Sequence, residues 1–193
     1  MPSKSLQLWA KDRATTLDEI EAAHQAVGGS RRGRRYATQQ LNQAYTVMLM
    51  SQFQGFCRDL HSEAVDHLVA AVLPTSVSSV LRPVLTENRA LDRGNANSSS
   101  LGSDFGRLGL SFWQEVKATD ARAEKWQQRL DQLNDWRNAI AHQSFGKLLR
   151  AGSRPVVSLQ QVREWRNACK GLARSFDRVI GVHLGSMVGN PPW

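Results

Sequence analysis

Three polar residues late in the sequence, Arg137, Asn138 and His142, could act together on a bound anion. A histidine titrates near neutral pH, so its side chain can donate or accept a proton during catalysis. An arginine can stabilise negative charge on phosphoryl oxygens, and an asparagine can orient a neighbouring group by hydrogen bonding. These residue types therefore indicate a candidate catalytic site.

The element that must position them is a helix predicted over residues 120–144. Its apolar stripe consists of Trp126, Leu130, Leu133 and Ile140. Arg137 occupies the place in this stripe where the next apolar residue is expected. A charge at such a place is costly unless it meets an anion, a carboxylate or another chain. The competing interpretation is that its aliphatic stem packs while its guanidinium reaches water.

A second face of the same helix is polar and carries Asp131, Asp135, Asn138 and His142. Asn138 and His142 are four residues apart, so their side chains are neighbours on a helix. Either aspartate could orient the imidazole of the histidine. The competing interpretation is an ordinary solvent-facing helix surface that ends in a histidine.

Helical periodicity runs through the whole sequence, and no segment shows convincing strand alternation. The predicted helices span about 6–27, 37–73, 77–90, 104–116 and 120–144, and a last helix carries an apolar seam from Val162 to Val179. We therefore expect an all-α fold, an up-and-down bundle of four to five main helices. It would form a single domain over 1–193, with a core at about 37–182 and an N-terminal helix and Arg-rich loop in 1–36.

Several local signals predict where these helices begin and end. Asp104 and Thr119 are candidate N-caps, Pro83 should disturb its helix, and the Gly/Asn/Ser-rich segment 94–100 should form a loop. Glu63 and His67 lie four residues apart within an apolar stripe. This spacing favours a buried hydrogen-bonded pair over a supporting role in the candidate site.

The chain is basic, with a net charge of +8 and a pI near 10.2. Four arginines lie in one short segment, namely Arg31, Arg32, Arg34 and Arg35. Residues 147–178 hold eight basic and two acidic residues, a net charge of +6. Such clusters favour nucleic acid or a membrane surface as a partner, although solvated helix faces also carry arginine.

Cys57 and Cys169 lie in apolar patterns without metal-type spacing, which predicts reduced, buried thiols. The sequence shows no zinc signature, phosphate-binding glycine loop or nucleophile elbow, so we expect no metal and no cofactor. It also shows no signal peptide or membrane-spanning run. We therefore expect a cytoplasmic protein that does not act at a membrane.

The string Arg137-Asn138-Ala139-Ile140-Ala141-His142 resembles the R-x4-6-H motif of the HEPN superfamily, which has a polar residue after the arginine. As in that family, the motif ends one bundle helix and precedes the closing helix. The segments 93–97 and 104–109 also look like bacterial HEPN relatives with toxin-like roles. The resemblance covers about Ala37 to Val182 and implies a helical HEPN-like fold.

The resemblance also implies a metal-independent endoribonuclease, with attack of the RNA 2′-hydroxyl on the adjacent phosphorus. Arg137, Asn138 and His142 would be catalytic, Asp131 and Asp135 supporting, and the four clustered arginines RNA-binding. Two motifs would face each other in a homodimer with a composite active site, because positions 137 and 142 point about 140° apart on one helix. A toxin or phage-defence role, with an antitoxin or inhibitor protein as partner, is the expected biological setting.

Two other functional classes compete with the ribonuclease. One is a non-catalytic HEPN module that binds RNA, a nucleotide or a protein partner, which the intact Arg137, Asn138 and His142 disfavour. The other is a basic helical DNA-binding protein, which the lack of a helix-turn-helix signal disfavours.

Overall fold

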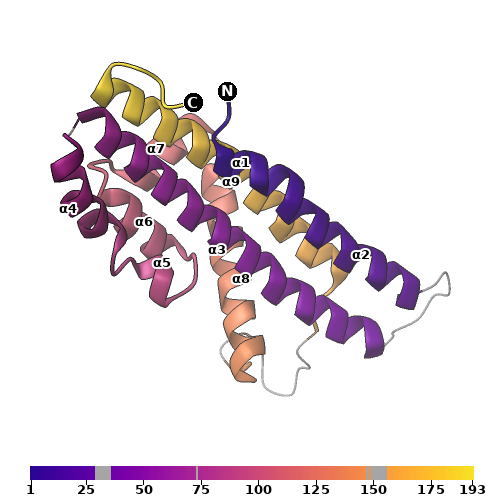
Figure 1. The fold of residues 1–193 in the computed structure, drawn as a ribbon. Coiled ribbons are helices and arrows are strands. Elements are labelled where there is room, and N and C mark those ends of the chain that lie inside the picture. Colours follow the sequence, from indigo (N-terminus) through magenta and orange to yellow (C-terminus); the bar gives the residue numbers. More distant parts are fainter. Residues whose placement is uncertain (29–35, 73, 147, 149–155) are drawn as a thin grey trace.

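The computed structural model describes residues 1–28, 36–72, 74–146, 148 and 156–193, and every regular element in these ranges is helical (Figure 1). In chain order these elements are α1 (Lys4–Leu8), the π-helical turn η1 (Trp9–Arg13), α2 (Ala14–Gly28), α3 (Tyr36–Val72), α4 (Thr75–Thr86), α5 (Ala90–Arg93), α6 (Ser98–Gly106), α7 (Phe112–Thr119), α8 (Ala123–His142) and α9 (Leu159–Val188). The all-α prediction is confirmed.

Four long elements form the bundle. The continuous segment α1–η1–α2 lies along α3 and α9, and α8 packs against both α3 and α9 (Figure 1). The apolar stripes predicted from the sequence face one another. Leu49, Phe53 and Leu60 of α3, with Trp165 and Leu172 of α9, are fully or almost fully buried. Burial of these stripes, rather than helix propensity alone, stabilises the long helices.

An aromatic cluster fixes the short helices α6 and α7 to this bundle. Phe105 of α6 stacks on Phe112 of α7 with ring centroids 4.5 Å apart, and Phe112 lies 4.8 Å from Phe176 of α9. Phe176 in turn contacts Phe53 of α3 at 6.1 Å. Such ring pairs add to the free energy gained from burial alone, so α6 and α7 are held at one end of the bundle.

The loop expected at 94–100 is confirmed only for residues 94–97, and the expectation that Asp104 begins a helix is wrong. Helix α6 begins inside that segment, at Ser98, and the side chain of Asn97 caps it by accepting from the Ser100 amide at 2.8 Å. Asp104 lies inside α6 and is fully buried. Its carboxylate accepts from the amides of Ala90 and Leu91 at 2.9 and 2.8 Å, so it caps the start of α5. Asp104 is therefore a capping residue for a helix that precedes it in the chain.

Three further local expectations are also corrected. Thr119 ends α7, where its hydroxyl donates to the Glu115 carbonyl, and α8 begins later, at Ala123. Glu63 accepts from the Lys4 and Ser5 amides at 2.8 and 2.9 Å, where a carboxylate favours the N-terminus of α1, and it is not paired with His67. Helix α4 continues through Pro83 to Thr86.

Candidate functional site

Helix α8 carries the Arg137–His142 motif, and its apolar side is held firmly against α9. Leu130 and Leu133 are completely buried, and Trp136 lies 6.4 Å from Trp165. Trp126 packs directly over the backbone of α9, where Gly171 has no side chain to obstruct the ring. These contacts set the rotation of α8, so the polar side of the helix must face outward.

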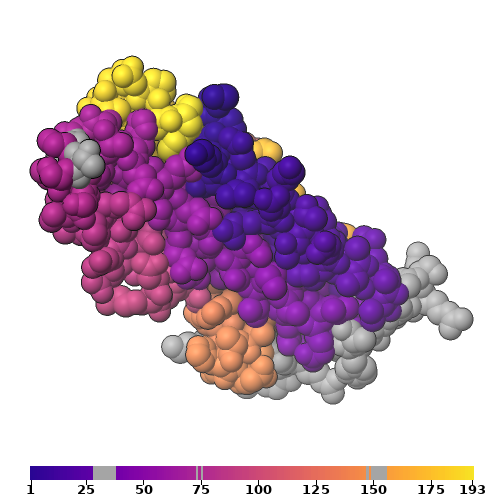
Figure 2. All heavy atoms as spheres, in the orientation of Figure 1, coloured from indigo at the N-terminus to yellow at the C-terminus, as the bar shows by residue number. Residues whose placement is uncertain are grey.

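The last turn of α8 projects from the bundle. Its orange C-terminal end extends beyond α3 in the ribbon and space-filling views (Figures 1 and 2). Gln143 ends the helix in the left-handed conformation with φ of 51°, and the Ser144 amide returns to the Ala139 carbonyl at 3.0 Å. His142, the last helical residue, is therefore exposed to solvent.

Asn138 joins the arginine of the motif to the neighbouring loop. Its Oδ1 atom accepts from Nη1 of Arg137 at 3.1 Å and from Nδ2 of Asn95 at 2.6 Å. Arg137 is half-buried and has no carboxylate within ion-pair distance in the described ranges. The guanidinium is thus directed toward Asn138 while its charge remains available to an anion.

A cavity of about 410 Å³ lies beside the end of α8. It is lined by Asp135, Asn138, Ala139, His142, Ser144 and Leu148. The structure therefore brings Asp135, Asn138 and His142 to one concave surface. Arg137 is outside this lining, as the 140° angle between positions 137 and 142 requires, and reaches it through the bond to Asn138.

Within one chain, Asp131 lies away from His142. Its carboxylate accepts from the Ser98 hydroxyl at 2.7 Å and from the Ser98 amide at 3.1 Å, at the start of α6. Eleven residues separate Asp131 from His142, about 16 Å along a helix. The aspartate instead holds α6 to α8. Asp135 is exposed and lines the cavity, without a hydrogen bond to the imidazole.

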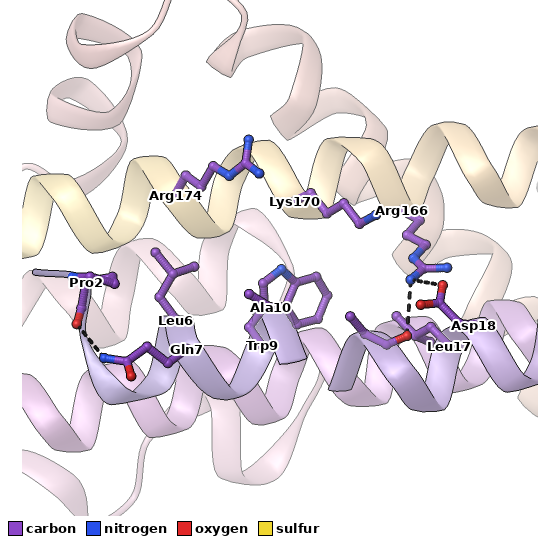
Figure 3. Close-up of a pocket in the computed structure, with 11 residues that line it drawn as sticks. Pro2, Leu6, Gln7, Trp9, Ala10, Leu17, Asp18, Arg166, Lys170 and Arg174 are labelled. Carbon is purple, nitrogen blue, oxygen red and sulfur yellow. Dashed lines mark hydrogen bonds and ion pairs between the residues drawn. The ribbon is translucent and has the colours of Figure 1, made fainter. Parts of the chain in front are cut away.

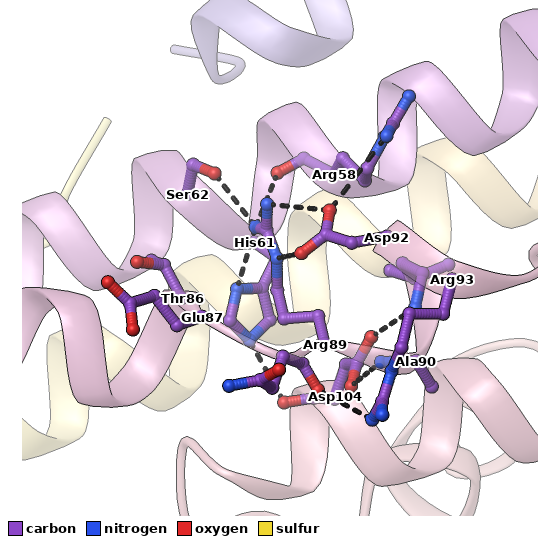
Figure 4. Close-up of polar contacts among 12 residues, drawn as sticks. Arg58, His61, Ser62, Thr86, Glu87, Arg89, Ala90, Asp92, Arg93 and Asp104 are labelled. Carbon is purple, nitrogen blue, oxygen red and sulfur yellow. Dashed lines mark hydrogen bonds and ion pairs between the residues drawn. The ribbon is translucent and has the colours of Figure 1, made fainter.

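A polar network that joins α3, α5 and α6 was not predicted from the sequence (Figure 4). His61 of α3 is completely buried, and its Nε2 lies 2.9 Å from the Asp104 carbonyl. Arg89 donates to Ser62 at 2.9 Å and pairs with Asp92 at 3.0 Å. Local spacing gives no signal for contacts that join α3, α5 and α6 across such separations in sequence.

This network fixes the loop that carries Asn95. In addition to Asp104 at the start of α5, Gln54 of α3 donates to the carbonyls of Leu91 and Gly94 at 2.7 and 2.6 Å. The loop is therefore tied to α3 and α6 immediately before Asn95. Asn95 in turn reaches α8, so the network positions a side chain in contact with the motif.

His61 is neutral in this environment. Burial is the main cause that lowers the pKa of its imidazole from 6.5 to about 4; the hydrogen bond with the Asp104 carbonyl opposes this shift, and the charge of Arg89 adds to it. The carbonyl of Asp104 requires a proton on Nε2. Nδ1, 3.4 Å from Nη1 of Arg89, then accepts a hydrogen bond. Protonation of Nδ1 would place two donors against each other.

Of the two basic segments predicted from the sequence, only the second has basic residues among the described ones, and these lie on α9. Arg31, Arg32, Arg34 and Arg35 lie outside the described residues. On α9, Arg163 pairs with Glu21 and Arg166 pairs with Asp18, so part of the predicted positive cluster is neutralised within the fold. Lys170 and Arg174 of the same helix are exposed and form no ion pair within the described ranges.

Both cysteines are buried free thiols, as predicted, and burial raises the pKa of each well above its ordinary value. No group of three or more histidine, cysteine or acidic side chains in the described part of the chain is arranged to hold a metal ion. None of the described helices combines the length and apolar character needed to cross a bilayer.

The helical bundle, with a polar motif at the exposed end of its penultimate helix, defines the class of protein. Residues 11–181 match the family model described as RiboL-PSP-HEPN. The chain therefore belongs to this HEPN family, which confirms the membership of the HEPN superfamily expected from the motif. No curated protein and no solved structure matches the chain.

Proposed function

We propose that this protein is a metal-independent endoribonuclease whose catalytic residues are Arg137, Asn138 and His142. The observation that carries the proposal is the bond from Arg137 to Asn138 at the edge of the cavity that His142 lines. A guanidinium without a carboxylate partner in the described ranges, an amide and an exposed imidazole thus lie within the last two turns of α8. Membership of a HEPN family supports an RNA-directed role for this arrangement.

The chemistry follows from the side chains. His142 would take the proton from the 2′-hydroxyl or give one to the departing 5′-oxygen, since an imidazole can do either near neutral pH. Arg137 would stabilise the charge that accumulates on the phosphoryl oxygens. Asn138 would hold the guanidinium through Oδ1 and could donate to a phosphate oxygen through Nδ2.

The test is cleavage of a defined RNA by the purified protein in EDTA. We expect internal cuts that leave a 2′,3′-cyclic phosphate or its hydrolysed product, because the 2′-hydroxyl is the nucleophile. The corresponding DNA lacks that hydroxyl and should resist. RNA that is bound but never cut would instead support the non-catalytic binding module, and cutting that requires magnesium would contradict the proposed chemistry.

We further propose that two chains form a homodimer with a composite site, in which Arg137 of one chain works with His142 of its partner. Mixing Arg137→Ala with His142→Ala protein tests this pairing. When the two variants are mixed in equal amounts and their subunits exchange freely, half of the dimers contain one chain of each kind. One of the two composite sites in such a dimer is intact, so about a quarter of wild-type activity should return. A site built within one chain would regain nothing, because each chain keeps one defect.

The biological setting in this proposal is a toxin or phage-defence effector controlled by an inhibitor protein. Induced expression of the wild-type chain should then arrest bacterial growth, whereas equal expression of His142→Ala should not. Growth arrest by both proteins would separate the toxicity from RNA cleavage.

A further inference from the structure

A second concave surface lies between the N-terminal segment and α9 and shares no lining residue with the cavity at His142. It has a volume of about 460 Å³, within the range of small-molecule sites. Figure 3 shows α1–η1–α2 along one wall and α9 along the other. We call this surface the N-terminal groove.

The floor of the groove is apolar and depends on the π-helical turn. Trp9 and Leu17, 4% and 1% exposed, both line it. Eight residues apart, they would point about 80° apart on an unbroken α-helix. The π turn at Trp9–Arg13 accommodates one extra residue, so the rotation between the two side chains is that of seven α-helical residues and not of eight. Because one residue corresponds to about 100°, the two side chains point only about 20° apart. Both can therefore face the groove.

The opposite wall is cationic. Arg166, Lys170 and Arg174 follow one another at four-residue spacing and line the groove from α9. Arg166 is held in place by Tyr45 at 3.0 Å and by Asp18 at 2.6 Å, so it forms a fixed part of the wall. Lys170 and Arg174 have no ion-pair partner in the described ranges, so the groove carries uncompensated positive charge.

A hydrogen-bond donor also faces the groove. The indole N–H of Trp9 makes no hydrogen bond to any described residue, and in Figure 3 the ring nitrogen lies on the edge that faces α9. The N–H is not sealed from solvent, so water or a ligand atom in the groove can accept a hydrogen bond from it. An acceptor atom within the groove would satisfy this donor and lie on the side of the free cations.

We propose that the N-terminal groove binds a small amphipathic organic anion, with one carboxylate or phosphate headgroup and an apolar chain. The headgroup accepts from Lys170, Arg174 and the indole N–H of Trp9. The chain lies over Leu6, Ala10 and Leu17. This inference does not depend on ribonuclease activity, because none of these residues belongs to the proposed catalytic site.

Calorimetric titration with decanoate, decyl phosphate, decanol and inorganic phosphate tests the proposal. We expect saturable binding of decanoate or decyl phosphate with one molecule per chain, and the tighter of the two identifies the headgroup. Decanol should bind at least about tenfold more weakly, since bonds to charged groups contribute on that scale. Inorganic phosphate should not bind, because it has no apolar chain.

Matched substitutions locate the binding site. Arg174→Gln should weaken binding of the preferred anion about tenfold or more, whereas Arg178→Gln, one turn further along α9 and outside the groove, should leave it unchanged. Ala10→Phe should fill the groove and abolish binding, whereas Ala22→Phe on the exposed side of α2 should not. Trp9→Phe should weaken it while keeping the apolar ring.

The folded state of each variant is checked by circular dichroism, so that loss of binding is separated from unfolding. The absence of saturable binding of both decyl anions to the wild-type chain would overturn the proposal. Equal effects of Arg174→Gln and Arg178→Gln would also overturn it, since they would indicate attraction by overall charge. Undiminished binding to folded Ala10→Phe would place the ligand elsewhere.

Discussion

Nδ2 of Asn95, in the loop between α5 and α6, donates across 2.6 Å to Oδ1 of Asn138 in α8. The same oxygen accepts from Arg137, so a loop residue and a motif residue converge on one atom. This arrangement fixes the orientation of the Asn138 amide and leaves its own N–H donors for another acceptor. Asn95 is thereby placed as a positioning residue for the proposed site.

Replacing His142 by alanine should reduce the rate of RNA cleavage by about 10²–10⁴, because a positioned acid–base group contributes on that scale. The exposed imidazole makes no hydrogen bond in the described structure, so the thermal unfolding midpoint should stay the same. His24→Ala, on α2, is the matched control and should cut normally. Full activity in His142→Ala would remove this residue from the mechanism.

Arg137→Lys should lose most cleavage activity, by about 10²–10³, although the positive charge is kept. A lysine ammonium cannot reproduce the planar fork of donors that would hold both Asn138 and a phosphate. Single-turnover rates are the appropriate measurement. Arg129→Lys, two turns earlier on α8 and paired with Glu164, should retain its rate. Equal losses in the two variants would point to helix stability instead.

Asn95→Ala and Asn138→Ala should be strongly non-additive, because they remove opposite ends of one hydrogen bond. We expect each single variant to lower kcat with little change in KM, and the double variant to lose scarcely more than Asn138→Ala. Ser99→Ala, on the exposed side of the same region, is the control. Additive losses would show that Asn95 does not act through Asn138.

Stability should fall as the pH is lowered from 7 to 5, partly because of His61. Its pKa is about 4 when folded and 6.5 in the unfolded chain, so the unfolded state binds more protons in this window. The contribution of His61 to the free energy of unfolding should decrease by about 2 kcal/mol between pH 7 and pH 5. Urea unfolding of the wild type and of His61→Gln measures the effect, and the variant should show the smaller change. Identical pH dependence in both proteins would mean that His61 is not the titrating group.

Gly171→Ala should destabilise the fold by about 1–3 kcal/mol, the usual effect of overpacking. A methyl group at this position would lie 2.5 Å from Cε2 and Cζ2 of Trp126, so α8 would have to shift away from α9. Gly185→Ala on the same helix meets nothing closer than 3.6 Å and should be neutral or slightly stabilising. Equal midpoints of denaturant unfolding for these two variants would contradict the packing role of Trp126.

The pattern of residues along the chain was sufficient for several conclusions. The apolar spacing predicted the long helices α3, α8 and α9, and the all-α class followed from it. The spacing of Arg137 and His142 on one helix predicted their divergence and the resemblance to the HEPN superfamily. These conclusions depend on neighbours three to five residues apart, which the geometry of a single helix relates directly.

The packing of several helices determined the hydrogen-bond partners of polar side chains, which local spacing does not predict. The shared helix face predicts that Asp131 or Asp135 orients His142, yet the start of α6 gives Asp131 a hydrogen-bond donor in Ser98. Local pattern predicts Asp104 as the N-cap of the helix that follows it, but its carboxylate accepts from the amides of Ala90 and Leu91, which precede it in the chain. The contact between Asn95 and Asn138 has no local signal, because the two residues lie 43 positions apart and are brought together by the docking of α5–α6 against α3 and α8. A polar side chain bonds to whichever partner the packed helices bring within reach, and the helical repeat of one segment does not contain that information.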